Sequence, residues 1–185
     1  MSSNLPTDEQ DVVPGRSCDG CTMCCKLLDI DVLDKPRGKW CPDCDQKNGC
    51  KIYEDRPSPC RNFYCGYMRI QHLDERWKPS KTKFLINYEA AANRIAIHAD
   101  PSRANAWRAE PFYSTIKAWA KQNASSGGTV VVWAGDDVTV VMPDKEKHLG
   151  RARADQFILP VHRQTPHGAE LDYELVEADD VRLRY

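Results

Sequence analysis

The chain has 185 residues, of which 41% are hydrophobic and 29% are charged, and its formal net charge is -1 at pH 7. This length allows one domain with a substantial core or two small domains, and the near-neutral charge excludes a general electrostatic attraction to nucleic acid. No apolar run approaches the about 20 residues that a membrane-spanning helix requires. Neither nucleic acid nor a membrane is therefore expected as a partner.

Residues 1–16 are polar and acidic, and they predict a flexible tail. They lack the basic start and the apolar stretch of a secretory signal peptide, so the sequence predicts a cytoplasmic protein whose thiols stay reduced. This expectation decides how the cysteines are interpreted. An odd number of cysteines in a reducing compartment favours metal binding over a disulfide framework.

All nine cysteines lie between residues 18 and 65, within a segment that is predicted to span residues 17–69. Thiols two residues apart can share one soft ion, and four thiolates complete either a tetrahedral zinc site or an iron–sulfur cluster. Prolines and glycines interrupt the segment repeatedly, so a metal is expected to replace apolar burial in holding it together. The predicted metal ligands are Cys18, Cys21, Cys24, Cys25, Cys41, Cys44, Cys50, Cys60 and Cys65.

The spacing leaves the number and the kind of metal centres open. Nine cysteines suffice for two four-ligand sites with one thiol left over, or for one site plus structural thiols. Zinc is the favoured ion, and iron or an iron–sulfur cluster is the alternative. The alternative rests on the run Cys18-x2-Cys21-x2-Cys24, which resembles part of a bacterial ferredoxin run but lacks the fourth ligand at the expected distance.

By spacing alone, the cysteines form a head group at residues 18–25 and a tail group at residues 50–60, which contains Pro57 and Pro59. The pair Cys41 and Cys44 lies between these groups and is expected to connect them. The adjacent side chains of Cys24 and Cys25 diverge in an extended backbone and also in a helix. These two cysteines are therefore predicted to have different roles. Pro57 and Pro59 restrict the backbone that presents Cys60.

Other residue types give weaker candidates. The cysteines suffice without a mixed-ligand site, although any one histidine could complete one: His72, His98, His148, His162 or His167. Four cations of the segment could offset the charge of ligand thiolates: Lys26, Lys51, Arg56 and Arg61. The sequence contains no Ser/His/Asp arrangement, phosphate-binding loop or HExxH helix, so it predicts binding rather than catalysis and no catalytic residue.

The order of the cysteines resembles that of a known family. The string Cys18-x2-Cys21-x2-Cys24-Cys25 is followed by Gly49-Cys50-x-Ile52-Tyr53-Glu54-x-Arg56-Pro57-x2-Cys60-Arg61-x-Phe63. Over roughly residues 17–69 these strings resemble the CxxCxxCC family of zinc- or iron-chelating proteins. The resemblance implies a metal-chelating role through eight cysteines. The chain departs from the family by having a ninth, and the two candidates for this extra cysteine are Cys44 and Cys65.

The remaining chain, residues 70–185, has the alternating apolar pattern of strands and the turn residues of hairpins. Strands are predicted at 84–88, 95–97, 129–133 and 138–142, with others at 157–161 and 171–176, and one at 28–32 inside the cysteine-rich segment. A helix is expected over 104–122, and it should end at Ser125-Ser126-Gly127-Gly128.

These elements predict an α+β fold in which a loop-rich, metal-stapled N-terminal segment packs on a small antiparallel sheet with one main helix. Residues 70–185 are expected to form one compact domain with the preceding segment. The leading function is a zinc or iron chelator with a structural or metal-handling role. The alternatives are an iron–sulfur redox protein or enzyme component, and a metal-stapled adaptor for a protein partner.

Overall fold

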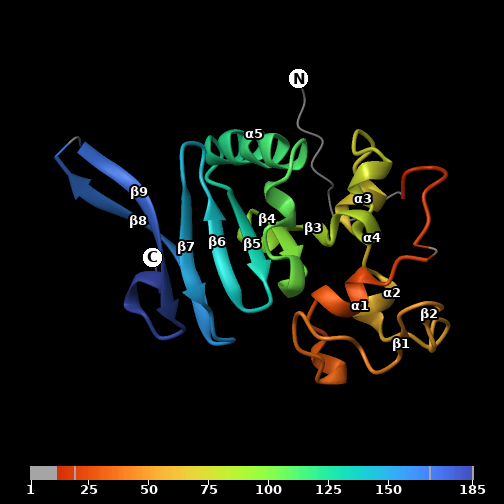
Figure 1. The fold of residues 1–185 in the computed structure, drawn as a ribbon. Helices are drawn as coiled ribbons and strands as arrows, with labels where there is room; N and C mark the ends of the chain where they lie inside the picture. The colour runs from red at the N-terminus through yellow and green to blue at the C-terminus, as the bar shows by residue number, and fades with distance from the viewer. Residues whose placement is uncertain (1–11, 19, 167, 185) are drawn as a thin grey trace.

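The computed structural model describes residues 12–18, 20–166 and 168–184. Within these residues, five strands form one mixed sheet in the order β3-β4-β5-β6-β7, and two smaller sheets contain two strands each. Figure 1 shows the cysteine-rich segment on one side of the central sheet and the hairpin β8–β9 on the other. The predicted α+β class is confirmed.

The central sheet consists of β3 (Phe84–Glu89), β4 (Arg94–Ala99), β5 (Thr129–Ala134), β6 (Asp137–Val141) and β7 (Glu146–Arg151). Both predicted hairpins are confirmed, because β3 pairs with β4 and β5 pairs with β6 in antiparallel fashion. The first turn contains η3 (Ala90–Ala92) and then Asn93, which has a φ of 44°. Asparagine tolerates this left-handed conformation better than most residues.

Strands β4 and β5 run parallel, so the prediction of an antiparallel sheet is wrong at this pair. The crossover helix α5 (Phe112–Ala124) returns the chain to the end of the sheet where β4 began. The helix was expected from residue 104, but Pro111 disfavours helical backbone in the residue before it. The chain instead forms short 3-10 turns, η4 (Pro101–Arg103) and η5 (Ala106–Arg108). Among the described residues, no helix combines the length and apolarity needed to cross a membrane.

Each face of the central sheet carries its own buried cluster, because successive strand residues point to opposite sides. Helix α5 packs on β5 and β6, and its Ile116 belongs to the same cluster as Val130 and Val132. The alternate residue Val131 belongs to the second cluster, together with Tyr173 of β9. The helix therefore covers one face, and the β8–β9 hairpin covers part of the other.

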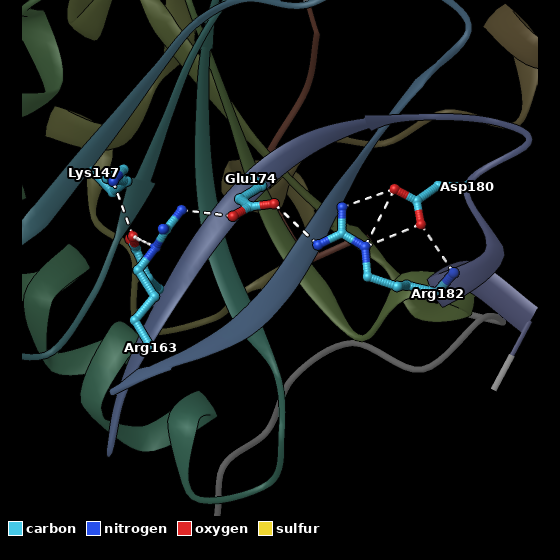
Figure 2. Close-up of polar contacts among 6 residues, drawn as sticks. Lys147, Arg163, Glu174, Asp180 and Arg182 are labelled. Carbon is cyan, nitrogen blue, oxygen red and sulfur yellow. Dashed lines mark hydrogen bonds and ion pairs between the residues drawn. The ribbon is translucent and has the colours of Figure 1, made fainter. Parts of the chain in front are cut away.

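The hairpin consists of β8 (Gln156–Thr165) and β9 (Gly168–Glu177), which confirms both predicted strands and extends them. A chain of ion pairs attaches it to the sheet (Figure 2), running from Lys147 through Asp172, Arg163, Glu174 and Arg182 to Asp180. The buried carboxylate of Asp172 accepts from Lys147 of β7 at 3.0 Å and from Arg163 of β8 at 2.8 Å. Asp172 therefore links the hairpin to the edge strand. The chain ends in η6 (Val181–Arg184).

The N-terminal half is built from short elements, as the loop-rich prediction stated. They are α1 (Met23–Leu27), η1 (Asp31–Leu33), β1 (Cys44–Asp45), β2 (Gly49–Cys50), α2 (Ser58–Arg61), α3 (Gly66–Arg69), η2 (Glu75–Trp77) and α4 (Pro79–Thr82). The predicted strand at 28–32 is wrong, since only Ile30 forms a bridge, to Lys35. The Lys35 ammonium donates to the carbonyls of Lys26 and Leu28, so those carbonyls do not serve a neighbouring strand.

Helices α1 and α3 both pack on β3, so the cysteine-rich segment and the sheet share one buried cluster. Leu27 of α1 is only 1% exposed in this cluster. A Cβ atom on Gly66 would lie 3.0 Å from the Cβ of Ile86, so α3 approaches β3 closely because Gly66 has no side chain. The segment that carries the thiols is thus fixed to the sheet by apolar packing as well as by its own turns.

His98 lies in β4 beneath the loop at residues 29–37. It is 3% exposed, it lies opposite Trp133 of β5, and the Arg37 guanidinium lies 4.1 Å from the Trp133 ring. Among the described residues, neither ring nitrogen of His98 has a hydrogen-bond partner. Burial lowers the pKa of His98 to about 3, and the positive charges of Arg37, Arg94 and Lys35 lower it further. The negative charge of Asp29 has the opposite effect.

His98→Leu is expected to reduce the acid sensitivity of the fold. In the unfolded chain His98 binds a proton when the pH falls below about 6.5, whereas in the folded chain it stays neutral. The free energy of unfolding therefore decreases as the pH falls below about 6.5. Between pH 7 and pH 5 this difference amounts to about 2 kcal/mol of unfolding free energy. Urea unfolding at both pH values should show a smaller loss in His98→Leu and an unchanged loss in His148→Gln. Equal losses in His98→Leu and the unsubstituted chain would contradict the prediction.

Candidate metal centre

Four thiols near the starts of α1 and α3 are close enough for their charges to interact. The Cys21 N–H donates to the Cys18 carbonyl at 2.9 Å, which forms the turn that leads into α1 and Cys24. Cys65 is the residue before α3. Burial raises the pKa of the Cys65 thiol to about 11, and the charges of Cys18 and Cys21 act in the same direction. We call Cys18, Cys21, Cys24 and Cys65 the first thiol group.

Arg16 holds the two parts of the first thiol group together. Its guanidinium donates to the carbonyls of Ile70 at 2.9 Å and Gln71 at 3.0 Å, and also to those of Tyr67 and Leu73. It lies 4.7 Å from the centre of the Tyr67 ring. Because these carbonyls follow Cys65 and Arg16 precedes Cys18, one side chain fixes both ends of the group. Residues 1–11 of the predicted tail lie outside the described residues.

Five other thiols around the short β1–β2 ladder are near enough for their charges to interact. The Cys41 N–H donates to the Cys25 carbonyl at 2.9 Å, and the Cys44 N–H donates to the Cys41 carbonyl at 3.1 Å. Cys44 of β1 pairs with Cys50 of β2. Cys60 lies in α2, behind Pro57 and Pro59 as the sequence predicted. We call Cys25, Cys41, Cys44, Cys50 and Cys60 the second thiol group.

The electrostatic interactions within the second group connect all five thiols. Burial raises the pKa of Cys44 to about 12, and the charges of Cys25, Cys41 and Cys50 contribute to this shift. Burial also raises the pKa of Cys60, again with contributions from the charges of Cys25, Cys41 and Cys50. A shared cation would relieve this mutual repulsion, because it favours the thiolate form of every member.

Cys25 is the acidic thiol of the second group. A hydrogen bond from the Cys24 thiol lowers the pKa of Cys25 to about 6 against the opposing effect of burial. A hydrogen bond from Cys44 and the positive charges of Lys35 and Arg56 act in the same direction. The lowered pKa favours the thiolate of Cys25, which is the form that binds metals.

The border between the two thiol groups falls between neighbouring residues of α1. The hydrogen bond that Cys24 donates to Cys25 raises the pKa of Cys24 well above its ordinary value, and burial and the charges of Cys21 and Cys18 add to this. Cys24 thus interacts with Cys18 and Cys21, whereas Cys25 interacts with Cys44, and the hydrogen bond between Cys24 and Cys25 joins the two groups. This division differs from grouping by spacing, because Cys25 leaves the head group and Cys65 enters it.

Cations contribute to the site in ways that the sequence did not indicate. The 4%-exposed Lys35 helps to lower the pKa of Cys25, and Arg16 fixes the first group, but neither residue has a spacing that marks it. Of the four cations predicted to offset thiolate charge, Arg56 also affects Cys25, whereas Lys26 pairs with Asp100 at 2.6 Å. The contacts of Lys35 and Arg16 with the two thiol groups are visible only in the folded chain.

No disulfide joins any of the nine cysteines, all of which lie within the described residues. Among the described residues, no three Cys, His, Asp or Glu side chains already converge on a point where a metal ion would lie. The thiols are near enough for their charges to interact, but their sulfur atoms do not form a finished ligand shell. The chemistry of the donor set fits zinc, iron or an iron–sulfur cluster, all of which take thiolate ligands.

The four described histidines belong to neither thiol group. His98 is buried in β4, His72 is exposed after α3, and His148 and His162 are exposed on β7 and β8. His167 lies outside the described residues. The prediction that cysteines alone would supply the ligands stays a prediction.

No known protein-family model, curated protein or solved structure matches the chain. The comparisons therefore bring no outside assignment to the two thiol groups. Their interpretation depends on the residues themselves: nine reduced sulfur atoms, two positioned cations and a backbone of tight turns.

Proposed function

We propose that the chain chelates zinc through its cysteines, with a structural or metal-handling role in the cytoplasm. The observation that carries this proposal is that the nine thiols form two groups whose members interact electrostatically, one of four and one of five, and a tetrahedral site needs four ligands. The resemblance of residues 17–69 to the CxxCxxCC family supports the same role. On this proposal the extra cysteine belongs to the second group, which has five thiols.

The charges around the groups also support chelation. Thiolates that bind one ion bring several negative charges together, and Lys35 and Arg56 lie close enough to Cys25 to lower its pKa. Hydrogen bonds and positive charges near ligand sulfur atoms are the usual outer partners of metal–thiolate sites. A reducing compartment would keep the thiols available for the metal.

An iron–sulfur cluster is the second candidate, because one specific observation favours it. The run Cys18-x2-Cys21-x2-Cys24 lacks a nearby fourth ligand in the sequence, but Cys65 lies within electrostatic reach of Cys18 and Cys21 in the fold. Four thiolates of this kind are what a cubane or a two-iron cluster requires. The first thiol group is therefore the candidate location for a redox-active cluster.

Elemental analysis of protein purified anaerobically, with reductant and without chelator, tests both candidates. We expect about two zinc ions per chain and no visible absorbance, because zinc is redox-silent and takes four ligands per site. Protein purified in parallel with a strong chelator serves as the control. Iron with acid-labile sulfide and a brown colour would favour the second candidate. A chain with neither zinc nor iron in stoichiometric amount would overturn both.

A further inference from the structure

A polar cavity of about 340 Å³ lies between the cysteine-rich segment and two other stretches of the chain, the residues just before β3 and those just after β4. One wall comes from the segment and consists of Gly20, Thr22, Met23, Trp40 and Gln46. The opposite wall comes from α4, η4 and the residues beside them, and consists of Ser80, Lys83, Asp100, Ser102 and Arg103. Its volume lies at the lower end of the range for small-molecule sites. None of its lining residues is a cysteine.

The one acidic side chain of the cavity wall is already neutralised. Asp100 is 5% exposed, and its carboxylate accepts from the Lys26 ammonium at 2.6 Å. Its other oxygen accepts from the Ser102 N–H at 2.9 Å and from the Ser102 hydroxyl at 2.8 Å. Asp100 thus adds no uncompensated negative charge, and its oxygens are not available to a ligand.

The two cations of the wall have no carboxylate partner among the described residues. The Lys83 ammonium donates to the Ser80 carbonyl at 2.5 Å, which leaves its charge uncompensated. Lys83 follows α4 with a φ of 63°, and it reaches this carbonyl from the left-handed position that ends the helix. In the described part of the chain, the Arg103 guanidinium forms no hydrogen bond and no ion pair. The cavity therefore carries a net positive charge.

Hydroxyl donors complete the wall. Within the described residues, the side chains of Thr22 and Ser80 have no hydrogen-bond partner, and Thr22 does not cap α1. The half-buried Trp40 supplies an aromatic surface, with Lys26 lying 5.4 Å from its ring centre. Two cations, two hydroxyls and one ring are suited to a small organic anion, because oxyanions bind best to charged nitrogen donors with hydroxyl support.

We propose that this cavity binds a small organic oxyanion, in which a carboxylate or phosphate group contacts Arg103 and Lys83 and the remainder lies against Trp40. The proposal is independent of metal chelation, because it uses no thiol. Two residues that line the cavity, Thr22 and Trp40, are the sequence neighbours of Cys21 and Cys41. A bound anion would therefore lie next to both thiol groups. The shared ligand chemistry is an oxygen-bearing anionic group of low molecular weight.

Isothermal titration of the reduced, full-length chain, purified without chelator, tests this proposal, with inorganic phosphate and succinate as separate probes at constant ionic strength. We expect at least one probe to bind at millimolar concentration or below. Arg103→Gln and Lys83→Gln should each weaken binding roughly tenfold, as the loss of one charge-assisted contact predicts. Lys121→Gln, which removes an exposed charge from α5, should leave the affinity unchanged.

The probe that binds identifies the group: phosphate indicates a phosphate ester, and succinate indicates a carboxylate. Arg103 is exposed and Lys83 is half-buried, so neither substitution is expected to prevent folding, and the metal content of each variant checks this. The absence of binding by both probes would overturn the proposal. So would equal affinities of the unsubstituted chain and both cavity variants. A chain without metal that still binds an anion would overturn only the proposed chelation.

Discussion

Cys21→Ser is expected to empty the first thiol group and to leave the second occupied. A hydroxyl is a poor replacement for a thiolate on a soft ion, and even changes outside the ligand shell weaken metal sites about 10–100-fold. Elemental analysis should show about one ion per chain instead of about two. Limited proteolysis should then cut near residues 17–28, because the binding free energy of such a segment is also its folding free energy.

Cys41→Ser is the matched control for that experiment. It removes one thiolate from the second group, so the remaining ion should now be in the first group, and cleavage should move to residues 38–60. Loss of all metal in either variant would contradict the division into two groups. Protease resistance equal to that of the unsubstituted chain in Cys21→Ser would contradict a metal-dependent fold for the segment.

Leu27→Ala is expected to destabilise the fold by about 2–5 kcal/mol, the range for a buried leucine that leaves a cavity behind. Leu27 is 1% exposed and packs in the cluster that joins α1 to β3. The same helix carries Cys24 and Cys25, so looser packing should also weaken metal binding. Denaturant unfolding of the metal-loaded protein measures the first effect, and competition with a chromophoric chelator measures the second.

Val32→Ala provides the comparison for Leu27→Ala. Val32 belongs to the same segment but is 64% exposed, so its truncation should change stability by less than about 0.5 kcal/mol. Metal affinity should then equal that of the unsubstituted chain. A similar loss of stability in both variants would show that α1 does not depend on its packing against β3.

The hairpins could be predicted because their signals are local. Alternating apolar residues and a Gly135-Asp136-Asp137 turn specify β5 and β6 without reference to the rest of the chain. The parallel pairing of β4 with β5 could not be predicted in the same way, since it depends on where α5 packs. Strand β7 has the sequence EKHLGR, whose polar residues suit an edge and give no alternating apolar pattern.

The candidate ligands could be identified from the sequence, but their division into two groups could not. Spacing places Cys25 beside Cys24, whereas the backbone bond from Cys41 draws Cys25 into the second group. Cys65 joins the first group through the contacts of Arg16 with residues 67–73. Both effects depend on contacts between residues distant in the chain, which residue spacing does not encode.

The cysteine-rich segment precedes the sheet on which it packs, and this order has a consequence for biosynthesis. A ribosome adds roughly 5–20 residues per second, so all nine thiols emerge several seconds before residues 84–134 have supplied β3, β4 and β5. During that interval Cys41 and Cys65 lack the burial that they have in the finished fold. An oxidant would therefore reach these two thiols more readily in newly made chains than in folded ones.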